Sequence, residues 1–406
     1  MDLHDGSPYW STRDGLPASY PPLDRDRSCD VAVVGAGITG TLIALELHAR
    51  GFDVVVLDRR DAAMGSTAAS TSMLQYEIDE LMIDLADAYS EDVERTCYTE
   101  SARGIDLVAR TTERLGVSCG FRRSPSVFIA VKRRDVPVVR AEMDARAAAG
   151  FDVRWLEPEE LRERWGLDGI GAVESTCGAS VDPYALAHAG LSALKTGGAS
   201  IFDRTEVTSF ELSPRRVRLV TDRGSTVSAK WCVVATGYEV ADLVKLPISL
   251  LSTFAFVSEP VADLARRYPD GLLFWEYADP YLYGRTTDDG RILVGGRDEQ
   301  YRDARRRGRA LPAKARALAR DAAKRLPAVE LEVGFSWCGT FAETPDGLPY
   351  IGVHPSLPRC RFALGFGGNG ITYSALAADY IASELTGNPV SAAEMFRLDR
   401  PERRPS

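Results

Sequence analysis

The chain has 406 residues, enough for two large cores, and its 45% hydrophobic and 26% charged content is ordinary for a globular protein. A formal net charge of −9 argues against a general nucleic-acid-binding surface. Seven scattered cysteines without a C-x-x-C pair, and four histidines without metal-ligand spacing, lead us to expect reduced thiols, no metal site and a cytoplasmic location. We expect no membrane span, because no apolar stretch approaches the roughly 20 residues that one requires.

The first 28 residues are rich in Pro, Ser, Asp and Arg and contain the sequences SPYW and YPPL. We therefore expect residues 1–28 to form an extended N-terminal arm. Its aromatic residues Tyr9 and Trp10 are expected to hold it against the body of the protein.

A β-α-β unit of about 30 residues follows the arm, the size that a dinucleotide-binding fold needs. The apolar run at 31–34 is typical of a strand that is buried on both faces. A helical pattern then runs to Gly51, which can end the helix, and a second apolar run at 54–57 predicts the next strand.

Three glycines and one acid stand where this unit would contact a dinucleotide. Gly35 allows the tight turn after the strand, Gly37 lets backbone N–H groups approach a pyrophosphate, and Gly40 lets the helix pack on the strand. The helix N-terminus adds partial positive charge. Asp58 can accept hydrogen bonds from ribose hydroxyls and would repel a 2′-phosphate, so the unit predicts FAD or NAD rather than NADP.

Loops and helices connect this unit to the later strands. Residues 59–80, rich in Ser, Thr, Ala and Gly, suit a loop and a short helix near a ligand. A capping Asp182 followed by Pro183 starts a helix that ends at Gly197 and Gly198. The other elements expected in this part are helices over 81–115 and 136–149, a helix start within 156–165, and a strand over 121–131.

Strands dominate much of the second half of the chain, and turn residues such as Asp289-Gly290 separate them. One helix is predicted over 312–326, and we interpret the basic run at 302–309 as a solvated loop and helix start. A glycine-rich loop at 365–370 precedes an amphipathic helix over 371–385. The predicted strands are 206–212, 216–221, 226–229, 231–235, 282–286 and 291–295.

Three stretches together resemble one family. They are GAGITG with Asp58, the buried strand that ends in Ala235-Thr236-Gly237, and the pair WCGTFAETPDGLPYIG and FALGFGGNGITYSALAADYIASEL. In this order they resemble the D-amino-acid oxidase-like (DAO) family of FAD-dependent oxidoreductases, over nearly the whole chain. The members nearest in look are of the glycine, sarcosine and γ-glutamylputrescine oxidase type.

The resemblance implies a mixed α/β fold, in which a Rossmann-like FAD-binding domain carries an inserted substrate domain built on an antiparallel or mixed β-sheet. Both domains are expected to be discontinuous. The implied FAD-binding domain comprises 29–85, 170–245 and 335–395, the substrate domain comprises 86–169 and 246–334, and a tail comprises 396–406.

The resemblance also implies FAD, and the sequence departs from related amine oxidases at two flavin-facing places. Ser66–Met73 stands where they carry a Gly-Arg-Asn-Gly-Gly type segment, and Asn369 stands where they tend to have histidine. We expect non-covalent FAD, because the register from Thr344-Pro345-Asp346 puts the position of covalent attachment on Gly339, one residue from Cys338. The cofactor-binding candidates are Gly35, Ala36, Gly37, Ile38, Thr39, Gly40, Asp58, Arg59, Ser66, Thr67, Ser70, Thr71, Ser72, Val207, Ala235, Thr236, Gly237, Gly339, Gly365, Gly367, Gly368, Asn369, Gly370 and Ile371.

In this family the flavin carries the reaction, so neither a catalytic triad nor a metal is needed. The expected reaction is oxidation of a CH–NH bond of an amino acid or secondary amine by hydride transfer to flavin N5, with O2 or an electron carrier as the acceptor. Two alternatives stay open: a 2-hydroxy-acid or polyol dehydrogenase, and the flavin subunit of a heteromeric amine dehydrogenase. A homo- or hetero-oligomer is equally open.

Tyr281, Tyr283 and Arg285 alternate along one predicted strand and therefore share a face. If this face meets the flavin, Arg285 can bind a substrate carboxylate as a bidentate fork and the tyrosines can orient the substrate. The alternative is a solvated arginine beside the turn at Asp288-Asp289. No catalytic residue is assigned, and the further candidates for the wall of the substrate site are Gln75, Tyr76 and Trp337.

Overall fold

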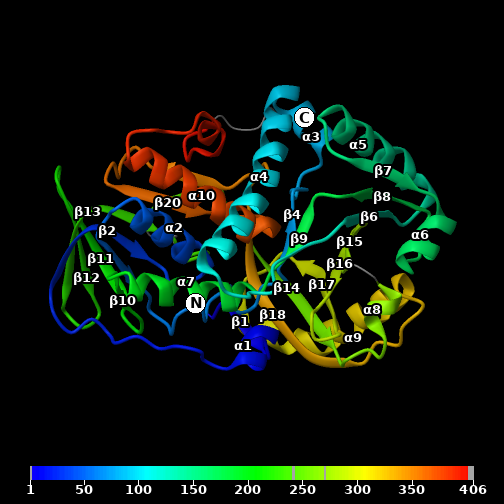
Figure 1. Ribbon diagram of the computed structural model, residues 1–406, viewed down its shortest axis with the longest axis horizontal. Coiled ribbons are helices and arrows are strands. Elements are labelled where there is room, and N and C mark those ends of the chain that lie inside the picture. Colours follow the sequence, from blue (N-terminus) through cyan, green and yellow to red (C-terminus); the bar gives the residue numbers. More distant parts are fainter. Residues whose placement is uncertain (1, 240–242, 269–270, 401–406) are drawn as a thin grey trace.

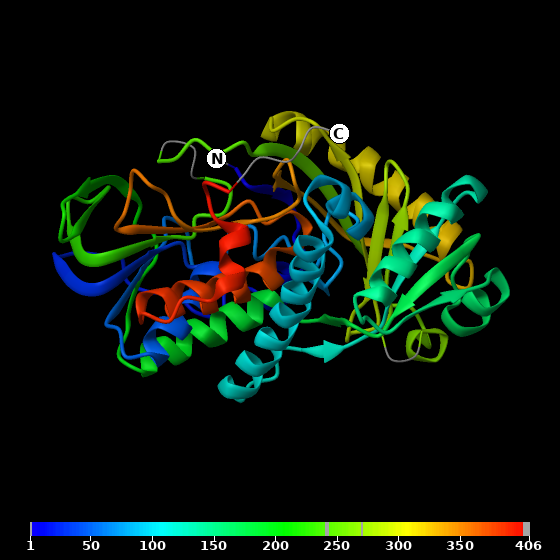
Figure 2. The ribbon, with the colours of Figure 1, turned by 90° about the horizontal axis from the view of Figure 1, so that it is seen from above.

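Two large β-sheets lie side by side and form the frame of the protein (Figure 1). The computed structural model describes residues 2–239, 243–268 and 271–400. The long helix α4 (Glu91–Leu115) stands near the junction of the two halves, and Figure 2 shows the same division from above. The mixed α/β fold with a Rossmann-like unit is therefore confirmed.

The first sheet is organised around β2 (Arg27–Val34), which has parallel neighbours on both sides. Val31 and Val33 belong to the core on one face, beneath the helices, whereas Ala32 and Val34 belong to the core on the other face. This two-sided burial explains the continuous apolar run. The other strands are β3 (Val54–Leu57), β10 (Ser200–Phe202), β11 (Val207–Leu212), β12 (Val217–Thr221), β13 (Thr226–Val234), β19 (Tyr350–Val353) and β20 (Cys360–Leu364).

Helices α2 (Ile38–Ala49), α7 (Pro183–Thr196) and α10 (Gly370–Leu385) share one core with α4 on the helical face of this sheet. The predicted cap of α7 is confirmed, because Asp182 accepts hydrogen bonds from the N–H groups of Tyr184 and Ala185. On the opposite face, β11 and β12 form the predicted meander with the first half of β13, and β20 pairs with its second half.

The second sheet has nine strands in the order β1-β18-β14-β17-β16-β15-β6-β8-β7. Helix α9 (Ala304–Arg325), α6 (Pro158–Trp165) and α8 (Leu264–Arg267) pack on one face, and α5 (Val136–Ala148) packs with a smaller cluster on the other. The strands are β1 (His4–Gly6), β6 (Ser126–Ala130), β7 (Val153–Leu156), β8 (Gly171–Ser175), β14 (Ser249–Ser258), β15 (Leu273–Tyr277), β16 (Leu282–Thr286), β17 (Ile292–Glu299) and β18 (Val333–Glu343).

Short elements complete the chain. A small sheet orders its strands as β4-β9-β5. In the part of the chain that the structure describes, no helix is both long and apolar enough to cross a membrane. The remaining elements are β4 (Met73–Gln75), β5 (Arg122–Arg123), β9 (Gly178–Ser180), α1 (Tyr9–Asp14), α3 (Met82–Ala88) and the 3₁₀ turns Arg133–Asp135, Gly367–Asn369 and Ser391–Phe396.

The N-terminal segment differs from the predicted extended arm, because it contains both β1 and α1. Strand β1 extends the second sheet by pairing with β18. Tyr9 and Trp10 are only 1% and 2% exposed, so the prediction that these two rings hold the segment against the body is confirmed.

Other elements were also predicted wrongly. The strand expected over 121–131 forms β5 and β6 in different sheets, and residues 59–80 contain β4 instead of a short helix. Helix α9 begins at Ala304 instead of residue 312, because Asp303 caps it by accepting a hydrogen bond from the N–H of Arg306, and Pro312 is tolerated inside the helix. The stretch 81–115 forms two helices, which are separated where Ser90 caps α4. The two strands predicted at 226–229 and 231–235 form the single strand β13.

Sheet pairing also differs from the expected division into domains. Strands β8 and β18 pair in the second sheet, whereas the resemblance implies that 170–245 and 335–395 belong to the FAD-binding domain. Helix α4 shares the core of α2 and α10, whereas the resemblance implies that 86–169 belongs to the substrate domain. The sequence pattern predicts these three elements, but it does not show which strands or helices they pack against in the folded chain.

Candidate active site

A cavity of about 1030 Å³ connects the two sheets and provides the candidate site. Its cofactor side is lined by the ends of β2, β3 and β13 and by the loops that follow them. Its substrate side is formed by the lining residues within 73–135 and 253–343. The carboxyl ends of parallel strands are the usual place for a ligand in an open α/β sheet.

The turn after β2 leaves its backbone open to the cavity. Gly35 has a φ of 113°, a conformation that favours glycine. A Cβ on Gly40 would overlap the carbonyl oxygen of Gly35, so the third glycine is required by the packing of α2 on the strand. Gly37, at the N-cap of α2, lines the cavity together with Ile38. A pyrophosphate can therefore approach this helix N-terminus, as the motif predicts.

Asp58 lies at the end of β3 and lines the cavity. Its carboxylate accepts hydrogen bonds from the N–H of Ala36 at 2.7 Å and from the N–H of Arg60 at 2.8 Å. Burial raises the pKa of Asp58, and these two backbone donors partly offset the effect. A carboxylate has about four lone-pair sites, so acceptor capacity is left for ribose hydroxyls.

The loop that contains Ser70 and Thr71 is held by three long side chains. Trp337 Nε1 donates to the carbonyl of Ala69 at 2.8 Å, and Trp10 Nε1 donates to the carbonyl of Ser70 at 2.7 Å. Arg285 Nε donates to the carbonyl of Thr71 at 2.8 Å. The carbonyl groups of three consecutive residues of this loop are thereby fixed.

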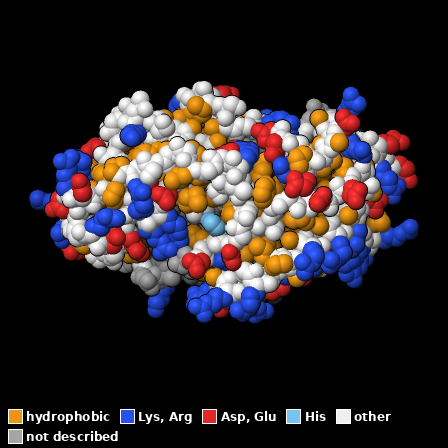
Figure 3. All heavy atoms as spheres, turned by 90° about the horizontal axis from the view of Figure 1, so that it is seen from below, with side chains coloured by type: hydrophobic (Ala, Val, Ile, Leu, Met, Phe, Trp, Pro, Cys, Tyr) orange, Lys and Arg blue, Asp and Glu red, His pale blue; other side chains and the backbone are white. Residues whose placement is uncertain are grey.

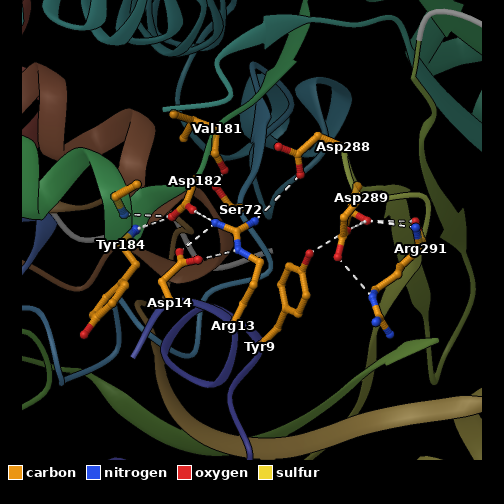
Figure 4. Close-up of polar contacts among 12 residues, drawn as sticks. Tyr9, Arg13, Asp14, Ser72, Val181, Asp182, Tyr184, Asp288, Asp289 and Arg291 are labelled. Carbon is orange, nitrogen blue, oxygen red and sulfur yellow. Dashed lines mark hydrogen bonds and ion pairs between the residues drawn. The ribbon is translucent and has the colours of Figure 1, made fainter. Parts of the chain in front are cut away.

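Helix α1 is braced by its own polar contacts (Figure 4). The Tyr9 hydroxyl donates to Asp289 at 2.6 Å, and Arg13 forms an ion pair with Asp182, the cap of α7. In the same view the Ser72 hydroxyl donates to the carbonyl of Val181 at 2.6 Å. The N-terminal segment thus connects this cavity-lining loop to both halves of the molecule.

The glycine-rich loop before α10 closes the cavity from the opposite direction. Asn369 is buried and its amide donates to the carbonyls of Gln75 at 3.0 Å and Glu77 at 2.8 Å. The N–H of Gly368 donates to the carboxylate of Asp79 at 2.9 Å. The loop is therefore tied to residues 75–79 by backbone and side-chain contacts.

Two tyrosines form part of the substrate side. The rings of Tyr281 and Tyr283 stack with their centroids 5.7 Å apart. The Tyr281 hydroxyl donates to Asp298 Oδ2 at 2.8 Å. Trp337 and Gln75 line the same cavity. These four predicted wall residues are brought together, although they come from β4, β16, β18 and the turn before β16.

Four predicted site residues do not line the cavity. Ala36 and Gly40 lie behind the turn, and Tyr76 is fully buried with its ring stacked on Phe151. Arg285 is 4% exposed and its guanidinium lies 5.3 Å from the centre of the Trp10 ring, so this placement does not suit a carboxylate anchor. All the other candidates line the cavity.

The cavity has a glycine, and not a cysteine, at the expected position of covalent FAD attachment. Gly339 lines the cavity, whereas the sulfur of Cys338 points to the carbonyl of Asp5, 3.8 Å away. All seven cysteines lie in the described part of the chain, and none of them lines the cavity. The alternation of β18 sends neighbouring residues to opposite faces.

Several cavity residues were missed by sequence reasoning, among them Asp79, Asp298, Glu343 and Phe341. Asp298 and Glu343 stand near the ends of β17 and β18, and Asp79 stands in the loop before α3. The sequence QYEIDELMID is acidic, but only the folded chain shows that its acids meet those of two distant strands.

Comparisons with known proteins agree with this geometry. The family model "DAO: FAD dependent oxidoreductase" matches residues 30–384. The chain is 25% identical to gamma-glutamylputrescine oxidoreductase of Escherichia coli (strain K12), over 96% of this chain and 90% of that protein. It is 28% identical to glycine oxidase of Bacillus licheniformis, over 92% and 98%. The crystal structure of glycine oxidase from Geobacillus kaustophilus superposes with a TM-score of 0.78 at 22% identity, covering 93% of this chain and 100% of that one.

The glycine turn, Asp58 and the lining of the cavity fit FAD, and the family match spans most of the chain. The chain therefore belongs to the DAO family of FAD-dependent oxidoreductases.

Proposed function

We propose that the protein oxidises a CH–NH bond of an amine or amino acid. The observation that carries this proposal is the single cavity that joins a dinucleotide turn to a tyrosine-lined pocket in a DAO-family chain. The relatives named gamma-glutamylputrescine oxidoreductase and glycine oxidase support a nitrogen-bearing substrate.

FAD, when bound, supplies the acceptor for the hydride that leaves the substrate carbon. The substrate nitrogen loses a proton in the same oxidation, so the C–N single bond becomes an imine that water hydrolyses to a carbonyl compound. The N-terminus of α2 and Asp58 would hold the cofactor, and Trp10 and Arg285 fix a loop that lines the same cavity. Tyr281 and Tyr283 provide the surface that orients the substrate.

The test is anaerobic mixing of the yellow holoenzyme with a panel of amines, amino acids and 2-hydroxy acids. We expect bleaching of the flavin absorbance by members of the first two classes. Reduction by hydroxy acids alone would contradict the proposal and favour the dehydrogenase alternative. A holoenzyme that no compound reduces until a copurifying second chain is added would favour the partner-dependent alternative.

A further inference from the structure

The substrate side of the cavity is strongly acidic. Among the described residues that line it, nine are Asp or Glu, whereas only Lys132 and Arg134 are positively charged, and both are exposed. The protein face in Figure 3 instead carries acidic and basic side chains interspersed. Carboxylates thus outnumber cationic side chains on this side of the cavity.

Some of these acids already have partners. Glu77 lies 3.4 Å from buried Arg146, Glu276 forms an ion pair with Arg325, and Asp135 lies 3.6 Å from Arg134. Asp79, Asp298 and Glu343 differ, because no lysine or arginine of the described residues forms an ion pair with any of them. We call these three residues the carboxylate trio.

The members of the carboxylate trio come from three separate segments. Asp79 lies in the loop after β4, Asp298 lies in strand β17, and Glu343 ends strand β18. Asp298 Oδ2 accepts the hydrogen bond of Tyr281, but its Oδ1 is a buried atom without a hydrogen-bond partner among the described residues. Asp79 uses one oxygen for the N–H of Gly368. The cavity thus contains acceptor capacity that the protein does not satisfy, and a buried acceptor without a partner is costly.

The members of the carboxylate trio also repel one another. Burial raises the pKa of Asp79 to about 7, and the charges of Glu343 and Asp298 add to this effect. Burial raises the pKa of Glu343 too, and the Asp298 and Glu80 carboxylates contribute. The charge of Lys314 acts on Asp298 without forming an ion pair, so the three carboxylates still favour a further cation near them.

The lining of this side indicates what kind of cation fits. Among the described residues, no three Asp, Glu, His or Cys side chains are placed to hold a metal ion, so the carboxylate trio does not form a metal site. Tyr281, Tyr283, Trp275 and Phe341 line the same side. Aromatic faces attract ammonium groups, and their apolar surface accommodates a methylene chain. A substrate carboxylate would instead meet like charge, and Arg285 is buried outside the cavity.

We propose that the preferred substrate is a diamine-type compound, which presents one amine for oxidation and places a second ammonium or guanidinium group among Asp79, Asp298 and Glu343. This inference rests on the proposed function, since it names the substrate class of the same site. The second cation takes the position for which the cavity supplies negative charge and unsatisfied oxygens. The CH–NH oxidation itself is the one described above.

The test compares three compounds with the same carbon chain: the diamine putrescine, the monoamine butylamine and the amino acid γ-aminobutyrate. We expect anaerobic flavin reduction to be at least about tenfold more efficient with putrescine than with butylamine, because a hydrogen bond to a charged group contributes about 1.5–3 kcal/mol. γ-Aminobutyrate should be the poorest of the three. Calorimetry on chemically reduced holoenzyme should give the same order of affinities without turnover.

The variants Asp298→Asn and Glu343→Gln should each lower the efficiency with putrescine more than the efficiency with butylamine, so that most of the preference for putrescine is lost, and the FAD content should stay nearly unchanged. The matched control is Glu211→Gln, which neutralises an exposed acid on β11 that is paired with Arg218. Equal efficiency with the diamine and the monoamine, or a preference for γ-aminobutyrate, would overturn the inference while leaving amine oxidation intact. Failure of every amine and amino acid to reduce the flavin would instead overturn the proposed function.

Discussion

The Nε atom of Arg285 lies 2.8 Å from the carbonyl oxygen of Thr71, and this hydrogen bond joins the second sheet to the loop that lines the cavity. The guanidinium also donates to the carbonyl of Thr286 at 3.1 Å and stacks on Trp10. Burial lowers the pKa of Arg285 to about 10, so the side chain remains charged at neutral pH. Arg285 is thus a positioning residue for the loop.

Replacing Arg285 with alanine should loosen this loop and weaken FAD binding. The Thr71 carbonyl loses its donor, which costs about 1–3 kcal/mol when the acceptor stays buried. Arg285→Lys should have a smaller effect, because an ammonium group can still donate to one carbonyl. Two quantities are measured for each variant: the Kd for FAD and the thermal unfolding temperature of the apoprotein. The variant Arg316→Ala on α9 serves as the control. The positioning role would be contradicted if Arg285→Ala left the Kd for FAD unchanged and raised only the KM for acidic substrates.

The second prediction separates the glycines of the dinucleotide turn. Gly37→Val should abolish FAD binding while the protein still folds, because Gly37 lines the cavity and a Cβ there meets only the Thr67 hydroxyl, at 3.0 Å. Gly40→Ala should instead destabilise the fold, because its Cβ would overlap backbone atoms of Gly35. Flavin absorbance after gel filtration and the unfolding temperature distinguish the two effects. A valine variant that retains full flavin occupancy would mean that the cofactor site is misplaced.

These glycines belong to the part of the fold that local sequence could predict. The strand at 31–34, the turn and Asp58 are adjacent in the chain, so one pattern specifies them all. Arg285 shows the limit of that reasoning. Strand alternation correctly places it on the face of Tyr283, but the position of the guanidinium depends on Trp10, which comes from a distant N-terminal helix. The carboxylate trio was missed for the same reason, because it forms only when distant strands pair.

The third prediction concerns the attachment of FAD. Acid precipitation should release the flavin from the polypeptide, because the cavity is lined by Gly339 and by none of the cysteines. The free cofactor is measured in the supernatant by its absorbance, and the polypeptide mass is measured by mass spectrometry. A polypeptide that carries the additional mass of FAD would contradict the prediction, and loss of that mass in Cys338→Ser would identify the attachment point.

The fourth prediction is a pH dependence of diamine binding. Asp79 is neutral below its pKa of about 7 and charged above it, so the affinity of the reduced holoenzyme for putrescine should rise as the pH increases through about 7. The groups that influence Asp79 are the N–H of Gly368 and the carboxylates of Glu343, Asp298 and Glu80. Asp79→Asn should flatten the profile. Affinity that falls over the same range would contradict the charge assignment.

The central claim is that this DAO-family chain oxidises amines through its bound FAD. The most direct measurement is a single anaerobic turnover with putrescine, in which flavin reduction and carbonyl product are quantified together. The account predicts one equivalent of carbonyl compound and one of ammonia for each flavin that is bleached. A flavin that stays oxidised with putrescine and with every other amine and amino acid, while a 2-hydroxy acid or polyol bleaches it, would contradict the account.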